Sequence, residues 1–171
     1  MAFSRIFWGI IFWFDFRING FDILPDIIGY VLIFSGLKLL LHINTHFISA
    51  QKISIPLIVL SMFNIFEINF GIFGFLIFVS FTILNLLLVF HLCKGIEVWA
   101  KYNGRYRLAD EATHRWKIYF VLTVVAAVLM MGSLVLLPIA LLLVIPLLIA
   151  NIIALILLLT LMKNAEKELR Y

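Results

Sequence analysis

Long apolar segments separated by short clusters of charged residues run along most of the chain. A helix needs roughly 20 apolar residues to cross about 30 Å of hydrocarbon. Three segments reach this length, namely residues 27–43, 71–93 and 118–162. The last segment contains no charged residue and is roughly twice as long as one crossing requires. We therefore expect it to form two helices.

Proline and glycine indicate where the long segments break. We expect the break within 118–162 near Gly132-Ser133 or just before Pro138, because the first turn of a helix tolerates proline. Pro146 falls inside the last helix, where we expect a kink. Tyr102-Asn103-Gly104 is expected to end another helix. Asp110 is then expected to cap the helix that follows.

Two further apolar segments, residues 6–14 and 53–66, are short, and each spans only roughly 15–21 Å as a helix. They either cross a thinned bilayer or enter and leave on one side. If all six segments cross and the N-terminus is cytoplasmic, every Lys and Arg except Arg17 falls on the cytoplasmic side, as the positive-inside rule requires. Trp13-Phe14-Asp15-Phe16 offers no small residue for signal-peptide cleavage, so the first segment is expected to be retained.

The expected fold is therefore an all-α integral membrane protein. We expect a six-helix transmembrane bundle in which the first and third helices are short and both termini are cytoplasmic. Four crossings with two re-entrant segments is the alternative.

Composition supports a membrane protein and excludes other classes. The 171 residues are 65% hydrophobic and 13% charged, against about 45–50% and about 25% in soluble domains. The mean hydropathy is +1.18. Disorder is excluded by the apolar fraction, and a disulfide scaffold by the single cysteine. We expect residues 1–171 to form one transmembrane domain.

The polar residues most suggestive of function lie between the first two expected helices. Their structural interpretation is that Arg17 pairs with nearby carboxylates and that Asp26 favours the start of a helix. Their functional interpretation is a polar vestibule at the outer face for a cation or a polar solute, because ionisable residues within a membrane are functional candidates. The candidate ligand-binding residues are Asp15, Arg17, Asp22, Asp26, Tyr30, Glu67 and Asn85.

Part of this region resembles a family signature. The motifs are Phe7-Trp8-Gly9, Asp15-Phe16, Leu24-Pro25-Asp26-Ile27-Ile28-Gly29-Tyr30 and Gly36-Leu37. They resemble the N-terminal signature of a group of small uncharacterised membrane proteins from Gram-positive, Firmicutes-type bacteria. The match covers roughly the first 40 residues. The resemblance implies a bacterial plasma-membrane protein and no particular activity. Independently, Gly29 is expected to allow close approach of another helix.

Motifs for catalysis or cofactor binding are missing from the sequence. His42 and His46 have a spacing that can hold zinc, but no Cys or carboxylate completes such a site, so no metal or cofactor is expected. The sequence has no phosphate-binding glycine loop and no serine nucleophile elbow, and we expect no enzyme. Six basic residues between Lys94 and Lys117 set the topology or bind anionic lipids. Nucleic-acid binding is not expected, because this segment is held between two membrane helices.

Two hypotheses for the function remain. The first is a small solute-binding or transport component, because a bound or transported solute would account for the charged vestibule. In size and helix number the chain is similar to the substrate-capturing subunits of energy-coupling-factor vitamin transporters, although their small-residue docking motif is absent. The second is a non-catalytic accessory, immunity or interaction subunit that packs against a larger membrane partner. The last two helices, which have almost no polar lining, favour the second.

Overall fold

The computed structural model describes residues 2–13, 17–18, 21–22, 26–65, 72–132 and 137–169. These residues form the helices α1 (Ala2–Ile11), α2 (Asp26–Lys38), α3 (Thr45–Ile65), α4 (Ile72–Tyr102), α5 (Tyr106–Gly132) and α6 (Leu137–Glu168). Two short strands, β1 (Arg17–Ile18) and β2 (Phe21–Asp22), pair antiparallel between α1 and α2. The expected helical class is confirmed, with this two-residue ladder as an addition.

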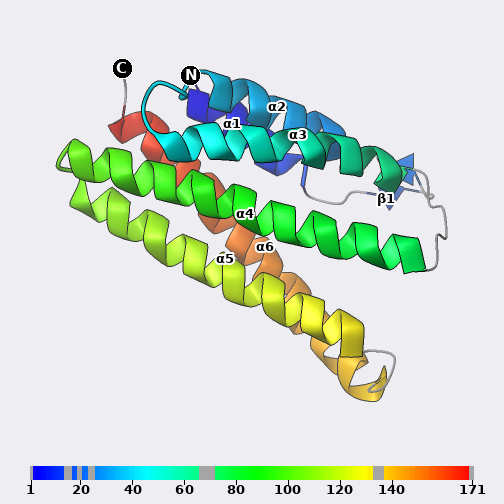
Figure 1. Cartoon of the computed structure of the whole chain (residues 1–171). Helices are drawn as coiled ribbons and strands as arrows, with labels where there is room; N and C mark the ends of the chain where they lie inside the picture. The colour runs from blue at the N-terminus through cyan, green and yellow to red at the C-terminus, as the bar shows by residue number, and fades with distance from the viewer. Residues whose placement is uncertain are drawn as a thin grey trace.

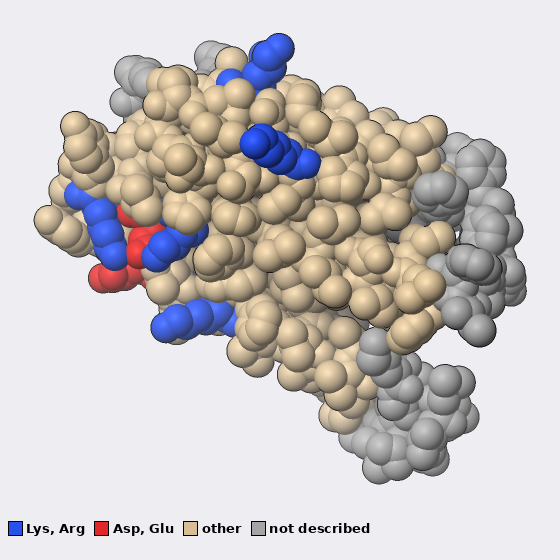
Figure 2. Space-filling view, in the orientation of Figure 1, with Lys and Arg blue, Asp and Glu red and all other residues tan. Residues whose placement is uncertain are grey.

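The helices form a closed ring in chain order. Each helix packs against the next one, and α1 packs against α6. Consecutive helices run in opposite directions, so both termini and the α4–α5 turn lie at one end, and β1 and β2 lie at the other (Figure 1). The first end, here called the charged end, carries Lys94, Glu97, Lys101, Arg107 and Glu111. In Figure 2 the charged side chains gather mainly at this end, and the rest of the described surface in this view is largely uncharged.

Three helices in the described part of the chain, α4, α5 and α6, are long and apolar enough to cross a membrane. The protein is therefore a membrane protein by the length and composition of these helices. The expected break between α5 and α6 is confirmed, since α5 ends at Gly132 and α6 begins at Leu137. Pro146 lies inside α6, as expected.

Two of the expected helix lengths are wrong. The first helix is short, as predicted, with 10 residues. However, α2 ends at Lys38 after 13 residues, and turns replace helix from residue 39 to residue 43. The third helix is not short, because α3 has 21 residues and is about 31 Å long.

A polar cap explains why α3 begins before the apolar segment. The Asn44 side-chain oxygen accepts hydrogen bonds from the backbone N–H groups of His46 (3.0 Å) and Phe47 (3.3 Å). These are donors that the first turn of a helix otherwise leaves unpaired. Hydrophobicity alone misses this start, because the first turns of α3 are mostly polar.

The α4–α5 turn is built around one glycine. Gly104 has a φ of 70°, a left-handed conformation that glycine adopts without a steric penalty. The Arg105 N–H bonds to the Ala100 carbonyl (2.8 Å) and the Gly104 N–H to the Lys101 carbonyl (3.1 Å), which is the Schellman pattern. The predicted break is confirmed. The predicted cap is wrong, because α5 begins at Tyr106 and Asp110 lies inside it.

Close backbone contact joins α1 to α2. A Cβ added to Gly29 would lie 2.7 Å from the Gly9 carbonyl oxygen, and one added to Gly9 would lie 2.6 Å from the Gly29 carbonyl oxygen. Neither backbone can move aside without moving a helix. The expected close approach at Gly29 is confirmed, and its partner is Gly9.

Candidate functional site

Two of the predicted ligand-binding residues meet inside the helix ring. Tyr30 on α2 is only 1% exposed. The Asn85 side-chain N–H on α4 donates a hydrogen bond to the Tyr30 hydroxyl oxygen at 3.2 Å. The two residues are 55 positions apart in the chain, so the helix packing creates this polar contact.

Among the residues that the structure describes, two buried polar atoms beside this contact have no hydrogen-bond partner. They are the Asn85 side-chain oxygen and the Trp13 indole nitrogen. A buried polar group without a partner costs about 1–3 kcal/mol. If the Asn85 amide were turned over, its oxygen would accept from Tyr30 and its NH₂ group would be left unpaired instead. In either orientation one half of the amide lacks a partner.

Aromatic rings surround this polar contact. The Trp13 ring centre lies 5.6 Å from that of Tyr30, and Phe81 meets Tyr30 edge to face at 5.8 Å. We call Trp13, Tyr30, Phe81 and Asn85 the aromatic–amide cluster. It joins the end of α1 to α2 and α4. Such a cluster can offer one acceptor and one donor within an apolar wall.

The remaining predicted residues lie partly outside the described residues. Asp26 begins α2, four residues before Tyr30, and is half-buried. Arg17 and Asp22 face each other across the β1–β2 ladder. Asp15 and Glu67 lie outside the described residues. The structure therefore brings Asp26, Tyr30 and Asn85 into one region.

A second polar group, which the sequence analysis did not single out, links α5 to α6 at the charged end. Glu111 accepts from Arg107 at 2.6 Å and from Arg115 at 3.1 Å. Arg107 also pairs with Glu168 of α6 at 2.6 Å, and Asn164 of α6 donates to Glu111 at 3.1 Å. The i,i+4 spacing of the α5 residues was the available signal. Nothing in the sequence indicated that Asn164 and Glu168 of α6 join this group.

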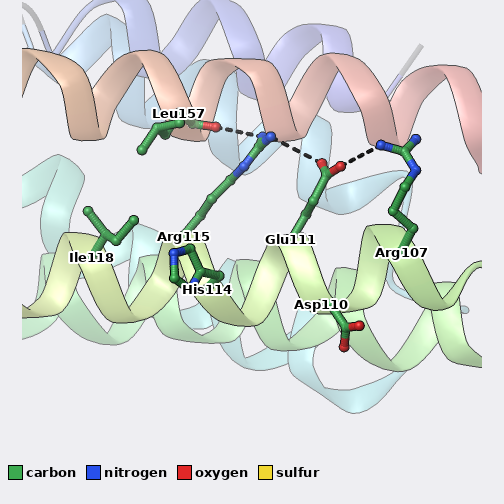
Figure 3. Close-up of a pocket in the computed structure, with 7 residues that line it drawn as sticks. All are labelled: Arg107, Asp110, Glu111, His114, Arg115, Ile118 and Leu157. Atoms are coloured by element: carbon green, nitrogen blue, oxygen red, sulfur yellow. Dashed lines mark hydrogen bonds and ion pairs between the residues drawn. The ribbon is translucent and has the colours of Figure 1, made fainter.

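Arg115 reaches furthest from the charged end in this group. Its side chain is only 12% exposed, and its guanidinium donates to the Leu157 backbone carbonyl at 2.8 Å. Figure 3 shows Arg107, Glu111 and Arg115 pointing toward α6, whereas Asp110 points away from it. Because both arginines already have carboxylate partners, this group ties two helices together and leaves little charge for a ligand.

A hollow of about 680 Å³ lies against this group (Figure 3). It is lined by Arg107, Asp110, Glu111, His114, Arg115, Ile118 and Leu157. It is an open depression, and its strongest charges neutralise one another.

A buried carboxylate also neutralises part of the basic segment. Glu97 is 7% exposed and accepts from Lys94 at 2.9 Å and from Lys101 at 2.7 Å. Four of the basic residues between Lys94 and Lys117 thus pair with carboxylates, namely Lys94, Lys101, Arg107 and Arg115. Fewer free positive charges therefore remain in this segment to bind anionic lipids.

Comparison with known proteins adds no candidate. The chain matches no protein-family description, no curated protein and no solved structure. The proposals below therefore depend on the chain's own residues and geometry.

Proposed function

We propose that this protein is a small solute-binding or transport component of a bacterial plasma membrane. The observation that carries the proposal is the aromatic–amide cluster, in which Asn85 and Trp13 each keep a buried polar atom that has no partner in the described part of the chain. Such atoms are costly at membrane depth, where no water satisfies them. Polar groups kept inside membrane segments commonly serve a transported or bound ligand.

The proposal requires a change of shape. The two unpartnered atoms are buried, so a solute reaches them only when the helices around Tyr30 separate. Trp13 lies in the turn that follows the short helix α1. We infer that movement at this end of α1 opens the cluster toward the outer vestibule, which Asp15, Arg17, Asp22, Asp26 and Glu67 would form.

The proposed topology has six crossings and cytoplasmic termini. It is supported by the antiparallel succession of helices and by the position of both termini at the charged end (Figure 1). Basic residues near short connections favour the cytoplasmic side. Asn103→Cys in a Cys93→Ala background is expected to react with a membrane-impermeant thiol reagent only when the cytoplasmic side is exposed. Labelling from outside would contradict this topology.

Ligand binding is tested by thermal unfolding of the purified protein in detergent, with a library of vitamins, metal ions and small metabolites. A solute that binds only the folded state raises the unfolding midpoint by mass action. We expect at least one such solute, and we expect Asn85→Leu to abolish its effect. Asn151→Leu is the matched control, because the Asn151 side chain donates to the Leu147 carbonyl of its own helix α6. A folded protein that no compound stabilises would contradict the proposal.

A second candidate is a non-catalytic interaction subunit, and one observation favours it. In the stretches 120–129 of α5 and 145–153 of α6, no side chain is buried. These apolar surfaces face either lipid or a partner helix. A photo-crosslinking residue at Ile149 distinguishes the two in native membranes. A single recurring protein adduct would support the interaction subunit, and lipid adducts alone would contradict it.

A further inference from the structure

We propose that His46 and His91 form a two-histidine site for a transition-metal ion, independent of the solute site proposed above. His46 lies in the first turn of α3 and His91 lies on α4. Their Nδ1 atoms are 3.2 Å apart, and both side chains are half-buried. The sequence analysis paired His46 with His42 by spacing, whereas the structure gives His46 a partner 45 positions further along the chain.

The separation of the two nitrogens fits a shared metal ion. Imidazole nitrogens bind zinc at about 2.0–2.1 Å in tetrahedral geometry, which places two of them about 3.3–3.4 Å apart. The observed 3.2 Å is therefore close to the spacing that coordination requires. Because the two nitrogens point almost directly at each other, each ring must turn by about 35° for both lone pairs to converge on one ion in tetrahedral geometry.

The metal-free pair is held by a hydrogen bond. The ring centres are 5.5 Å apart, near the largest value that a 3.2 Å contact allows, so the two nitrogens point almost directly at each other. One Nδ1 must then carry the proton and the other must accept it. On metal binding that proton moves by way of solvent to Nε2 of the same ring. Both rings then bind as neutral imidazoles, and the number of protons is unchanged.

Neighbouring contacts keep the two rings in place. The Asn44 cap fixes the backbone of His46. The Phe90 ring packs against His91 with ring centres 5.2 Å apart, and Trp116 packs against Phe90, also at 5.2 Å. Contacts of this kind hold a ligand's orientation before the metal arrives.

The donor set indicates the class of metal. Imidazole nitrogens suit Cu²⁺, Ni²⁺ and Zn²⁺, and they suit Mg²⁺ and Ca²⁺ poorly. Within the described ranges, no third His, Cys, Asp or Glu joins these two into a larger metal-binding group. The other coordination positions are therefore open to water or to a small solute. A bound ion would fasten α3 to α4.

The test uses the full chain in detergent, freed of metal with a chelator and then given ZnCl₂, NiCl₂ or CuCl₂. We expect a rise in the unfolding midpoint of about 2–4 °C, reversed by excess chelator. His46→Asn and His91→Asn should each abolish the rise. His114→Asn is the matched control, because His114 is exposed on α5 and should leave the rise intact.

A spectroscopic measurement keeps the proposal falsifiable if a variant fails to fold. The electron paramagnetic resonance spectrum of the wild-type protein with one equivalent of Cu²⁺ should show coupling to two imidazole nitrogens. Coupling to a single nitrogen would overturn the proposal, and so would a midpoint rise that persists in folded His91→Asn protein. Absence of any metal effect in the wild type would leave the pair as a hydrogen bond only and would also overturn it.

Discussion

The hydrogen bond between Tyr30 and Asn85 illustrates how much one buried polar atom can matter in this protein. The hydroxyl oxygen satisfies one half of the Asn85 amide and leaves the other half unpaired. Removing one partner of a buried hydrogen bond costs more than replacing both by apolar groups of similar shape. The pair therefore offers a clean test of whether the polar contact serves stability or serves another purpose.

Tyr30→Phe is expected to lower the free energy of unfolding by about 1–3 kcal/mol, because the Asn85 amide then loses its partner. The double variant with Asn85→Leu should recover most of that loss. Thermal or denaturant unfolding in detergent of the two single variants and the double variant measures this coupling. If the double variant lost as much unfolding free energy as the two single variants together, there would be no such coupling.

The Gly9–Gly29 contact makes a similarly local prediction. Gly29→Ala places a methyl group 2.7 Å from the Gly9 carbonyl oxygen, so α1 and α2 must move apart. We expect a loss of about 1–3 kcal/mol in unfolding free energy. Val31→Ala on the exposed face of α2 is the control and should change stability by only about 0.5 kcal/mol. Equal effects of the two variants would show that the helices are not in close contact.

The ends of the helices depend on local hydrogen bonds as much as on hydrophobicity. The α4–α5 turn was predictable, because Tyr102-Asn103-Gly104 carries its own turn chemistry. The start of α3 was not predicted, since the first turns of this helix are mostly polar. Asp110 was a plausible cap by residue type, but the Gly104 turn already starts α5 at Tyr106.

The Asn44 cap can be separated from its second contact. The Asn44 side-chain N–H also donates to the Gly95 carbonyl on α4 at 3.0 Å. Asn44→Ala removes both contacts and should cost about 0.5–2 kcal/mol from the cap alone. Asn44→Asp keeps the capping oxygens and should retain most of the stability of α3. Circular dichroism during thermal unfolding measures both variants, and an Asp variant as unstable as the Ala variant would show that the α4 contact dominates.

In the described part of the chain, many charged side chains lie at the end that carries both termini. In Figure 2 the visible charged side chains gather mainly at this end, and most of the other described surface carries no charge. Large hydrophobic residues are strongly exposed on several helices, among them Val128 on α5 and Ile149 on α6. A surface of this kind is stable only when lipid or a partner covers it.

Ile149→Lys tests where the membrane lies. Ile149 is 51% exposed midway along α6, and a lysine at the centre of a membrane helix costs about 2.5–3.5 kcal/mol. We expect less inserted protein and a lower unfolding midpoint in lipid nanodiscs. Tyr106→Lys is the control, because Tyr106 is 67% exposed at the charged end. If the two variants behaved alike, Ile149 would be in contact with water.

The sequence predicted the class of protein and several helix boundaries, because apolar length and turn residues are local properties. It also singled out Tyr30 and Asn85, but it did not predict that they touch, since they are 55 positions apart. The His46–His91 pair was missed for the same reason. Contacts between residues far apart in the chain depend on how the helices pack into the ring. The residue pattern of a single sequence does not predict that packing.

The ring of helices in chain order has a consequence for synthesis at the membrane. Each helix finds its first packing partner in the one made just before it, so the hairpins can assemble as the ribosome delivers them. Closure of the ring by the contact between α1 and α6, with the bond from the Ser4 backbone N–H to Glu166, must wait for the last helix. Until α6 is released, one flank of α1 is without its final neighbour, and a chain stalled after α5 would present that flank to chaperones and quality-control proteases.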